Sequence, residues 1–332
     1  MADDGREVHG HRMVPDDDAE VRLGLSSLDP LVVRPRVSAR VACLLLGLLL
    51  VGLAFAAWWV GVRTMDGQAF EDMVWSYLPS LLPAVMRTVV GLVARSAVVI
   101  ALSAAFAIVG VACAIFRRRW WLLGQMVVLA LLGYAATWLK SLLVRPMIIE
   151  TESRHLNSAP SGHVIMAALA GAALLMAVPR VARALAAVLA TLLTSVVGLS
   201  VLYGQWHRPV DVLMSLLLVA GLCLVVLAGT RTSGMDPVGG RASSTAIQII
   251  GSVLVTAGLV ALVYGVFIIW QILPGLDMSA AWARSGAVLT AEVLVVGVCA
   301  LTSGLVLAMR QVTASPLSKI GLIGAPPAPP RP

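Results

Sequence analysis

The stretch that decides the fold is residues 96–143, where SAVVIALSAAFAIVGVACAIF is followed by RRR at 117–119 and then by WWLLGQMVVLALLGYAATWLKSLL. Each apolar run beside the arginines is long enough to cross a bilayer, whose hydrocarbon core needs about 20 such residues. Basic residues next to such a run are typical of a membrane surface. The stretch therefore predicts a pair of membrane helices joined by a short basic loop.

Further apolar spans are expected at approximately 41–62, 163–179, 184–202, 212–230, 246–272 and 285–309. An amphipathic helix is expected before residue 96, because apolar residues from Phe70 to Val85 recur at three-and-four spacing. The 332 residues are 59% hydrophobic and only 12% charged, with a mean hydropathy of +0.94. Since about a quarter of the residues in soluble proteins are charged, a water-soluble enzyme is excluded. The predicted fold class is all-α, a polytopic membrane helix bundle of about eight transmembrane helices.

Charge and cysteine content give no indication of a nucleic-acid site, of disulfides or of a zinc site. The net charge of +7 is explained by orientation in the membrane, so no nucleic acid is expected as a partner. The cysteines lie in apolar runs without CxxC spacing, so neither disulfides nor a zinc site is indicated. Basic residues beside the spans are more numerous on the side of the N-terminus. This bias predicts a multi-pass cell-membrane protein with a cytoplasmic N-terminus.

Residues that can do chemistry gather in two loops, both expected at the outer ends of spans. The first loop begins at Lys140, contains Arg145 and His155, and closes with PSGH at 160–163. The second loop reads YGQWHRPVD at 203–211. Three of the five histidines of the chain fall in these loops. The gathering predicts a chemical site at the outer face.

In the second loop, Asp211 follows His207 by four residues, so one helical face would bring the carboxylate to the ring. Pro209 suits the first turn of a helix, where its missing N–H costs nothing. A carboxylate in this place fixes the tautomer and leaves the other ring nitrogen free to attack or to take a proton. The same pair could serve only to cap the helix, and the residues alone leave both interpretations open.

In the first loop, Ser161 is placed to cap a helix whose free amides make an anion site, and Gly162 leaves room for close approach. His163 stands at the rim of that site, in position to donate a proton. Lys140 and Arg145 would supply positive charge around a phosphate, as phosphoryl transfer requires. Each feature has an ordinary alternative, namely a capped helix end, a snorkelling lysine and a loop charge.

The two loops together resemble the type-2 phosphatidic acid phosphatase superfamily of membrane lipid phosphatases. The resemblance lies in the lysine, the arginine and the PSGH of the first loop and in the His-Asp pair of the second. The resemblance covers residues 140–211 and implies a six-helix core, with the last two spans outside it. It also implies dephosphorylation through a covalent phosphohistidine, without a metal or a cofactor. By this resemblance, His207 is the nucleophile, Asp211 orients it and His163 protonates the leaving group. The phosphate would be held by Lys140, Arg145, Ser161 and the amide of Gly162.

Two departures from the family pattern concern arginines. The family usually has six residues between the lysine and Arg-Pro, whereas Arg145 follows Lys140 after four. The family's third motif usually has arginine where this chain has Val201. Arg208 or Arg154 is the candidate substitute, and Arg208 is included among the expected phosphate-binding residues. Losing one charge-assisted contact would cost about 2–4 kcal/mol in the transition state.

The sequence therefore predicts a phosphatase that cleaves a phosphomonoester or pyrophosphate of a lipid, of the polyprenyl pyrophosphate or phosphatidate type. The expected partners are that lipid and the bilayer, and the residues do not indicate an oligomeric state. Two other interpretations stand beside it. One is a catalytically impaired family member that binds anionic lipid or serves as a membrane scaffold, and the other is a small transporter that uses Lys140 and Glu292. The trio of His163, His207 and Asp211 favours the enzyme, because neither lipid binding nor packing needs it.

The chain divides into four expected segments. They are a disordered cytoplasmic tail at 1–38, the six-helix phosphatase-like core at 39–231, two additional transmembrane helices at 232–312 and a Pro-rich tail at 313–332. The first segment is predicted to be disordered because it is acidic and shows no apolar periodicity. The last is not expected to fold because of its proline content.

Overall fold

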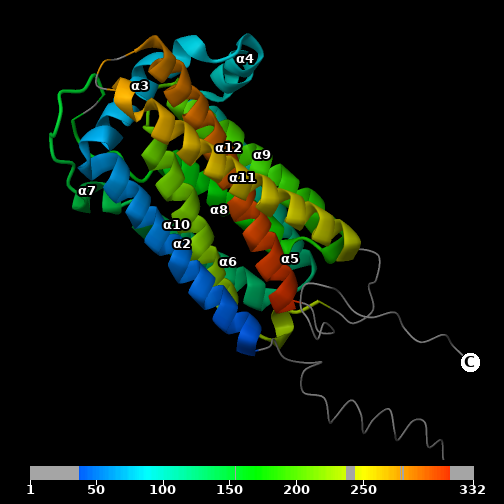
Figure 1. Cartoon of the computed structure of the whole chain (residues 1–332). Helices are drawn as coiled ribbons and strands as arrows, with labels where there is room; N and C mark the ends of the chain where they lie inside the picture. The colour runs from blue at the N-terminus through cyan, green and yellow to red at the C-terminus, as the bar shows by residue number, and fades with distance from the viewer. Residues whose placement is uncertain (1–36, 154, 237–243, 277, 279, 315–332) are drawn as a thin grey trace, which may run out of the picture.

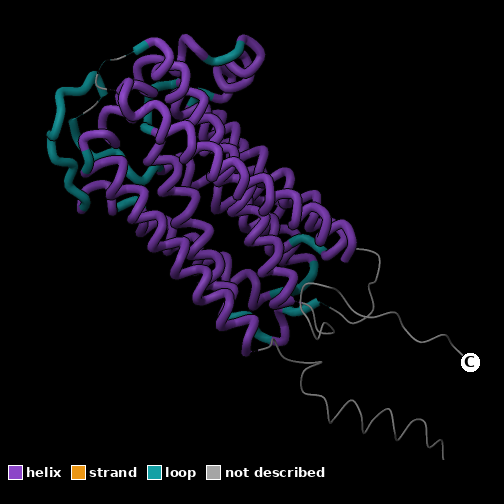
Figure 2. The backbone as a smooth tube through the Cα atoms, in the orientation of Figure 1, coloured by secondary structure: helices purple, strands orange, loops and turns teal. Residues whose placement is uncertain are grey.

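The computed structural model describes residues 37–153, 155–236, 244–276, 278 and 280–314. Every regular element in these residues is a helix, and Figure 2 shows helices joined by loops and turns. The all-α fold class is therefore confirmed. The expected tails lie almost wholly outside the described residues, at 1–36 and 315–332, so the predicted division of the chain stays a prediction.

Long helices run side by side along one axis (Figure 1). They are α2 (Val37–Arg63), α5 (Ser96–Phe116), α6 (Trp120–Ala136), α8 (Gly162–Ala177), α9 (Arg183–Tyr203), α10 (Pro209–Ala228), α11 (Ser244–Leu276) and α12 (Ala281–Ala314). The shorter helices are α3 (Met65–Leu81), α4 (Ala84–Val93), α7 (Leu139–Leu142), η1 (Arg180–Ala182) and η2 (Thr232–Gly234). Among the described residues, 7 helices are long and apolar enough to cross a membrane, with α6 and α7 taken together. α8 is shorter, with 16 residues, but it lies in the bundle between the same two ends as its neighbours.

At one end of the bundle, α2, α6 and α9 finish and α5, α8 and α10 begin. We call this end the site end. α3 and α4 lie at this end, bent by 108° to one another (Figure 1). The amide of Gln68 on α3 donates to the carbonyls of Val62 and Pro146, and Gly91 on α4 lies against the ring of Tyr203. Because both helices contact segments at the site end, the pair enters and leaves there and does not cross the bundle.

The amphipathic helix expected between Phe70 and Val85 is α3. Its buried apolar residues are Phe70, Met73, Val74 and Leu78. The helix ends at Leu81, earlier than the periodicity suggested, because Pro83 follows two residues later. A residue before proline is kept out of the helical region, and Leu82 accordingly has an extended ψ of 135°. The proline therefore makes the bend between α3 and α4.

α2 and α10 approach each other closely through two glycines. A Cβ added at Gly47 would lie 2.8 Å from the carbonyl oxygen of Gly221, and one added at Gly221 would lie 2.7 Å from that of Gly47. Real Cβ atoms do not come this close to a carbonyl oxygen, so only glycine fits at both positions. Small residues at a helix crossing are a common way for membrane helices to pack. The contact places α10, which follows His207 and carries Asp211 in its first turn at the site end, against α2.

The opposite end of the bundle holds a buried ion pair. Both terminal nitrogens of Arg183 lie 2.7 Å from the carboxylate oxygens of Asp236. Burial by itself would raise the pKa of Asp236, but the Arg183 guanidinium beside it holds the pKa below its ordinary value. Arg310 of α12 donates to the carbonyls of Met176 and Gly234. α12 is therefore bonded to the end of α8, and the last two helices belong to the same bundle.

Gly47→Leu is expected to destabilise the protein by about 1–3 kcal/mol, because the new side chain overpacks the contact between α2 and α10. The measurement is the thermal unfolding midpoint of the detergent-solubilised protein. Gly52→Leu is the matched control on the same helix, since a Cβ at Gly52 meets no atom within 4 Å. Equal midpoints for the two variants would contradict close packing at Gly47.

Candidate active site

The first turn of α10 brings a histidine and an aspartate together. Nδ1 of His207 lies 3.1 Å from Oδ2 of Asp211. Asp211 is fully buried, and the same oxygen accepts from the hydroxyl of Ser158 at 2.5 Å and from the backbone N–H of Arg208 at 3.0 Å. A carboxylate that accepts a hydrogen bond from Nδ1–H leaves Nε2 of His207 with a free lone pair. This is the arrangement that a nucleophilic histidine needs.

The local sequence explains why α10 starts in this way. Pro209 is its first residue, where a missing N–H leaves no bond unmade. Asp211 is its third residue, and its side chain accepts from the backbone of the residue before the helix. The Asp211 carboxylate therefore both caps α10 and contacts the ring of His207, as the two interpretations of the pair separately proposed.

α8 begins at Gly162 after its N-cap Ser161, whose hydroxyl accepts from the N–H of Val164 at 3.5 Å. Ser161 is fully buried, and its own N–H donates to the hydroxyl of Ser215 on α10 at 2.8 Å. A Cβ added at Gly162 would meet no atom within 4 Å, so the space beside it is open. The helix end expected to bind an anion is therefore open at Gly162, while the Ser161 hydroxyl acts as its cap.

His163 is held by two residues that sequence reasoning missed. Its Nε2 lies 2.8 Å from the hydroxyl of Ser96, the first residue of α5. Its ring centroid lies 5.2 Å from that of Trp206 in the second loop. These contacts fix the ring and leave Nδ1 as the nitrogen that can meet a substrate. Ser96 lies 67 residues away along the chain, and no spacing in the sequence connects it to His163.

A cavity of about 690 Å³ opens among these segments at the site end. It is lined by Lys140, His155, Leu156, Asn157, Ser158, His163, Trp206 and His207. Asn157 fastens the loop that forms one side, since it donates to the carbonyl of Lys140 and accepts from Nε1 of Trp58 on α2. The structure therefore brings Lys140, His163 and His207, all expected from the sequence, to one space.

The two arginines expected to bind phosphate do not line this cavity. Arg208 is 1% exposed, and its side chain donates to the hydroxyl of Ser153 and to the carbonyl of Leu156. Both terminal nitrogens of Arg145 are buried and have no hydrogen-bond partner among the described residues. Burial and the nearby positive charge of Arg208 lower the pKa of Arg145. A phosphate would satisfy such guanidinium donors, and the role of both arginines stays a prediction.

The position at which the family's third motif usually has arginine lies in the core. Val201 is fully buried, and its carbonyl accepts from the backbone N–H groups of Trp206 and His207. Its backbone thus supports the turn before the His-Asp pair, while its side chain supplies no charge. Arg154, the other candidate substitute, lies outside the described residues.

A carboxyl group that sequence reasoning missed lies beside the first turn of α10. Glu71 of α3 is 2% exposed, and its Oε1 accepts from the N–H of Val210 at 3.0 Å. Its Oε2 is buried without a hydrogen-bond partner in the described part of the chain. Burial raises the pKa of Glu71 to about 8, and the Asp211 carboxylate adds to this shift against the opposing charge of Arg208. A signal was present, since Glu71 lies three residues before Val74 on the apolar face of an amphipathic helix.

Comparison with known families agrees with this site. Residues 126–234 match the family model of the PAP2 superfamily. The chain carries a PAP2 region. The region runs from within α6 to η2 and contains both loops of the cavity, so the resemblance seen in the sequence is confirmed. Comparisons with curated proteins and with solved structures gave no match. α2, α3, α4, α5, α11 and α12 lie outside the PAP2 region.

Glu71→Gln is expected to make stability less sensitive to alkaline pH. A carboxyl with a raised pKa in the folded state contributes stability that is complete below its ordinary pKa of 4.5 and is lost as the pH rises through about 8. Glutamine keeps the oxygen that accepts from Val210 but cannot ionise. The unfolding midpoint in detergent should fall between about pH 6 and about pH 9 in the wild type, and should fall less in the variant. An identical fall in both proteins would show that Glu71 does not titrate in this range.

Proposed function

We propose that the protein hydrolyses a phosphomonoester or a pyrophosphate of a lipid through a phosphohistidine intermediate. Residues 126–234 match the PAP2 superfamily and the described residues include helices apolar enough to span a membrane, which suggests a phosphatase-type function. The observation that carries the proposal is the buried His207–Asp211 pair, whose ring shares one cavity with His163 and Lys140. The proposed reaction uses neither a metal ion nor a cofactor.

In the first step, Nε2 of His207 attacks phosphorus, and the bond from phosphorus to the leaving oxygen breaks. His163 gives that oxygen a proton as it departs, and Asp211 stabilises the positive charge that develops on the attacking ring. In the second step, water attacks the phosphohistidine, the phosphorus–nitrogen bond breaks, and His163 takes a proton from the water. Phosphate leaves, and both histidines return to their starting states.

Phosphate binding completes the proposed site. Phosphoryl transfer depends mainly on positioning and on stabilisation of charge. Lys140 lines the cavity, the start of α8 is open at Gly162, and the Ser161 hydroxyl caps that helix end. Arg208 donates to Ser153 and Leu156 in the first loop, so its contact with phosphate requires these bonds to be exchanged for bonds to the substrate.

A lipid substrate fits the position of the cavity. The cavity lies at the end of a bundle of apolar helices, so a phosphate can enter it while the lipid chain stays at the level of the helices. Polyprenyl pyrophosphate and phosphatidate both have this form. We place the cavity at the outer face of the cell membrane and the N-terminus in the cytoplasm, because of the basic residues beside the spans.

The second candidate function is that of an impaired family member that binds anionic lipid or serves as a scaffold. Val201 in place of an arginine and the burial of the Arg145 terminal nitrogens favour it. The two candidates differ in one measurement, the release of phosphate by the folded wild-type protein. A folded protein that binds a lipid phosphate without releasing phosphate would support this second candidate.

His207→Ala is expected to lower phosphate release by about a thousandfold or more, because the attacking nitrogen is removed. The assay measures phosphate released from a polyprenyl pyrophosphate and from a phosphatidate in detergent with a metal chelator present. His155→Ala is the matched control, since His155 is an exposed histidine of the same cavity with no proposed role. Undiminished release by His207→Ala, or no release by the wild type, would reject the phosphohistidine mechanism.

Arg208→Lys is expected to lower kcat/KM by about a hundredfold, since lysine keeps one charge but loses the forked donors that suit phosphate. Arg87→Lys on α4 is the control, because Arg87 is exposed at the same end of the bundle. Both variants are compared at equal folded fraction, judged by their unfolding midpoints. Wild-type kcat/KM in Arg208→Lys would remove Arg208 from the phosphate-binding set.

A further inference from the structure

Arginines from several segments meet at the end of the bundle opposite the site end. Arg183 is paired there with Asp236, and other arginines lie around this pair. We call the whole set the arginine cluster, and its members are Arg117 and Arg119 of the turn between α5 and α6, Arg180 of η1, Arg183 of α9 and Arg310 of α12. Figure 1 shows this end of the bundle, where α5 and α12 finish.

Shared backbone acceptors show that the members of the arginine cluster approach one another. The adjacent carbonyls of residues 176 and 177, at the end of α8, accept from Arg310 and Arg117. The carbonyls of residues 233–235, directly before Asp236, accept from Arg119 and Arg310. Since Arg310 takes part in both sets of bonds, it joins the arginines of the turn after α5 to the segment that leads to the buried ion pair.

Negative charge is scarce at this end. Among the described residues, Asp236 supplies the only carboxylate here. The remaining acidic residues that the structure describes lie at the site end or in the first half of α12, namely Asp66, Glu71, Asp72, Glu150, Glu152, Asp211 and Glu292. Burial and the positive charge of Arg119 lower the pKa of Arg117. The arginine cluster therefore carries an excess of positive charge that its described surroundings do not balance.

The described residues also leave hydrogen-bond donors of the cluster unused. Arg310 is 1% exposed, and its Nη1 has no hydrogen-bond partner in the described part of the chain. The same holds for Nε of the fully buried Arg183. Capping of helix ends explains the bonds to carbonyls, and orientation in the membrane explains exposed basic residues such as Arg118. Neither explains buried guanidinium groups without enough acceptors, because such donors are costly to bury.

We propose that the arginine cluster binds a phosphate group, carried by an anionic lipid head group or by a free phosphate ion. The Arg183–Asp236 pair is itself buried, so the phosphate lies in front of it, on the partly exposed Arg117, Arg119 and Arg180. Guanidinium groups present forked donors that match phosphate oxygens. The buried charges behind them add an attraction that salt screens little.

The position of the cluster suits such a ligand. It lies where membrane helices end, and basic pockets between membrane helices on the cytoplasmic side bind anionic head groups. The orientation proposed above places this end of the bundle on that side. The site lies at the opposite end of the bundle from His207, and it does not depend on the proposed hydrolysis.

Retention of phosphatidylglycerol tests the lipid source. The full-length protein in detergent is mixed with phosphatidylglycerol or with phosphatidylcholine, and bound lipids are counted by native mass spectrometry. We expect the wild type to prefer phosphatidylglycerol and Arg119→Gln to weaken its binding by about tenfold. Arg118→Gln is the matched control, an exposed arginine of the same turn outside the cluster, with an expected change of less than about threefold. Equal weakening by both variants would overturn the proposal.

The unfolding midpoint in inorganic phosphate, compared with chloride at equal ionic strength, tests the free ion. A bound ligand raises the midpoint, and Lys140→Gln separates the candidate active site from the cluster. A rise that persists in Lys140→Gln and is lost in Arg119→Gln assigns the ion to the cluster. Arg119→Lys, which keeps a donor for the backbone carbonyls, should match the wild-type midpoint without ligand and still lose most of the rise. A rise lost only in Lys140→Gln, with equal retention of the two lipids, would overturn the proposal.

The acidic residues before α2 are the competing occupant, since Asp16, Asp17 and Asp18 offer carboxylates to the same arginines. The variant with all three changed to asparagine tests them. Phosphate or phosphatidylglycerol binding that is unchanged or stronger in this variant supports the proposal. A midpoint that falls in the variant, while the wild type responds neither to phosphate nor to phosphatidylglycerol, would overturn it in favour of this segment of the chain.

Discussion

The carboxylate of Asp211 is the contact on which the site end of the molecule depends. Its Oδ2 accepts from the hydroxyl of Ser158, from Nδ1 of His207 and from the backbone N–H of Arg208. These donors belong to the loop before α8, to the ring proposed to attack, and to the residue that precedes α10. A buried negative charge is favoured at this place because it lies at a helix N-terminus. One group therefore sets the loop, the ring and the start of the helix together.

The charges around Asp211 follow from burial. Burial raises the pKa of Glu71 to about 8, so at neutral pH this carboxyl is mainly protonated. With Glu71 neutral, the guanidinium groups of Arg145 and Arg208 face the carboxylates of Asp211 and Asp72. A neutral Glu71 therefore avoids a third negative charge behind the cavity, where a phosphate would be repelled by it. α3, which carries Glu71 and lies outside the PAP2 region, therefore contributes to the electrostatics of a site built mainly within it.

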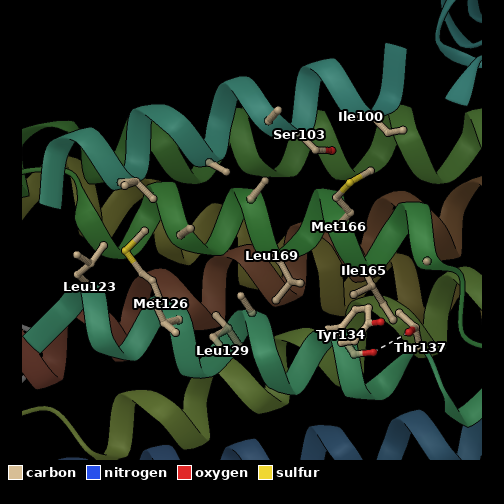
Figure 3. A pocket seen from close by; sticks show the side chains of 18 residues that line it. Ile100, Ser103, Leu123, Met126, Leu129, Tyr134, Thr137, Ile165, Met166 and Leu169 are labelled. Carbon is tan, nitrogen blue, oxygen red and sulfur yellow. Dashed lines mark hydrogen bonds between the residues drawn. The ribbon is translucent and has the colours of Figure 1, made fainter. Parts of the chain in front are cut away.

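The two ends of the bundle use their polar residues differently. At the opposite end, Arg183 is paired in two places with Asp236, and Arg310 donates to two backbone carbonyls. These bonds join α12 to α8 and to the segment after α10, so their role is to hold the helices of the bundle together. At the site end, polar side chains line an open cavity, and a second cavity with almost entirely apolar walls lies between α5, α6 and α8 (Figure 3). The site end therefore offers open space to a ligand, which the buried ion pair at the other end does not.

The sequence by itself determined what depends on neighbours along the chain. Apolar runs predicted the spans, because bilayer thickness sets helix length, and the spacing of His207 and Asp211 predicted their contact, because residues four apart share a helical face. Only the tertiary structure decided the rest: the bond of Ser96 to His163, the contact of Glu71 with α10, the burial of Arg145, and the apolar cavity between α5, α6 and α8. Each of these depends on how separate helices pack, and apolar periodicity along one helix records which face is buried but not which partner covers it.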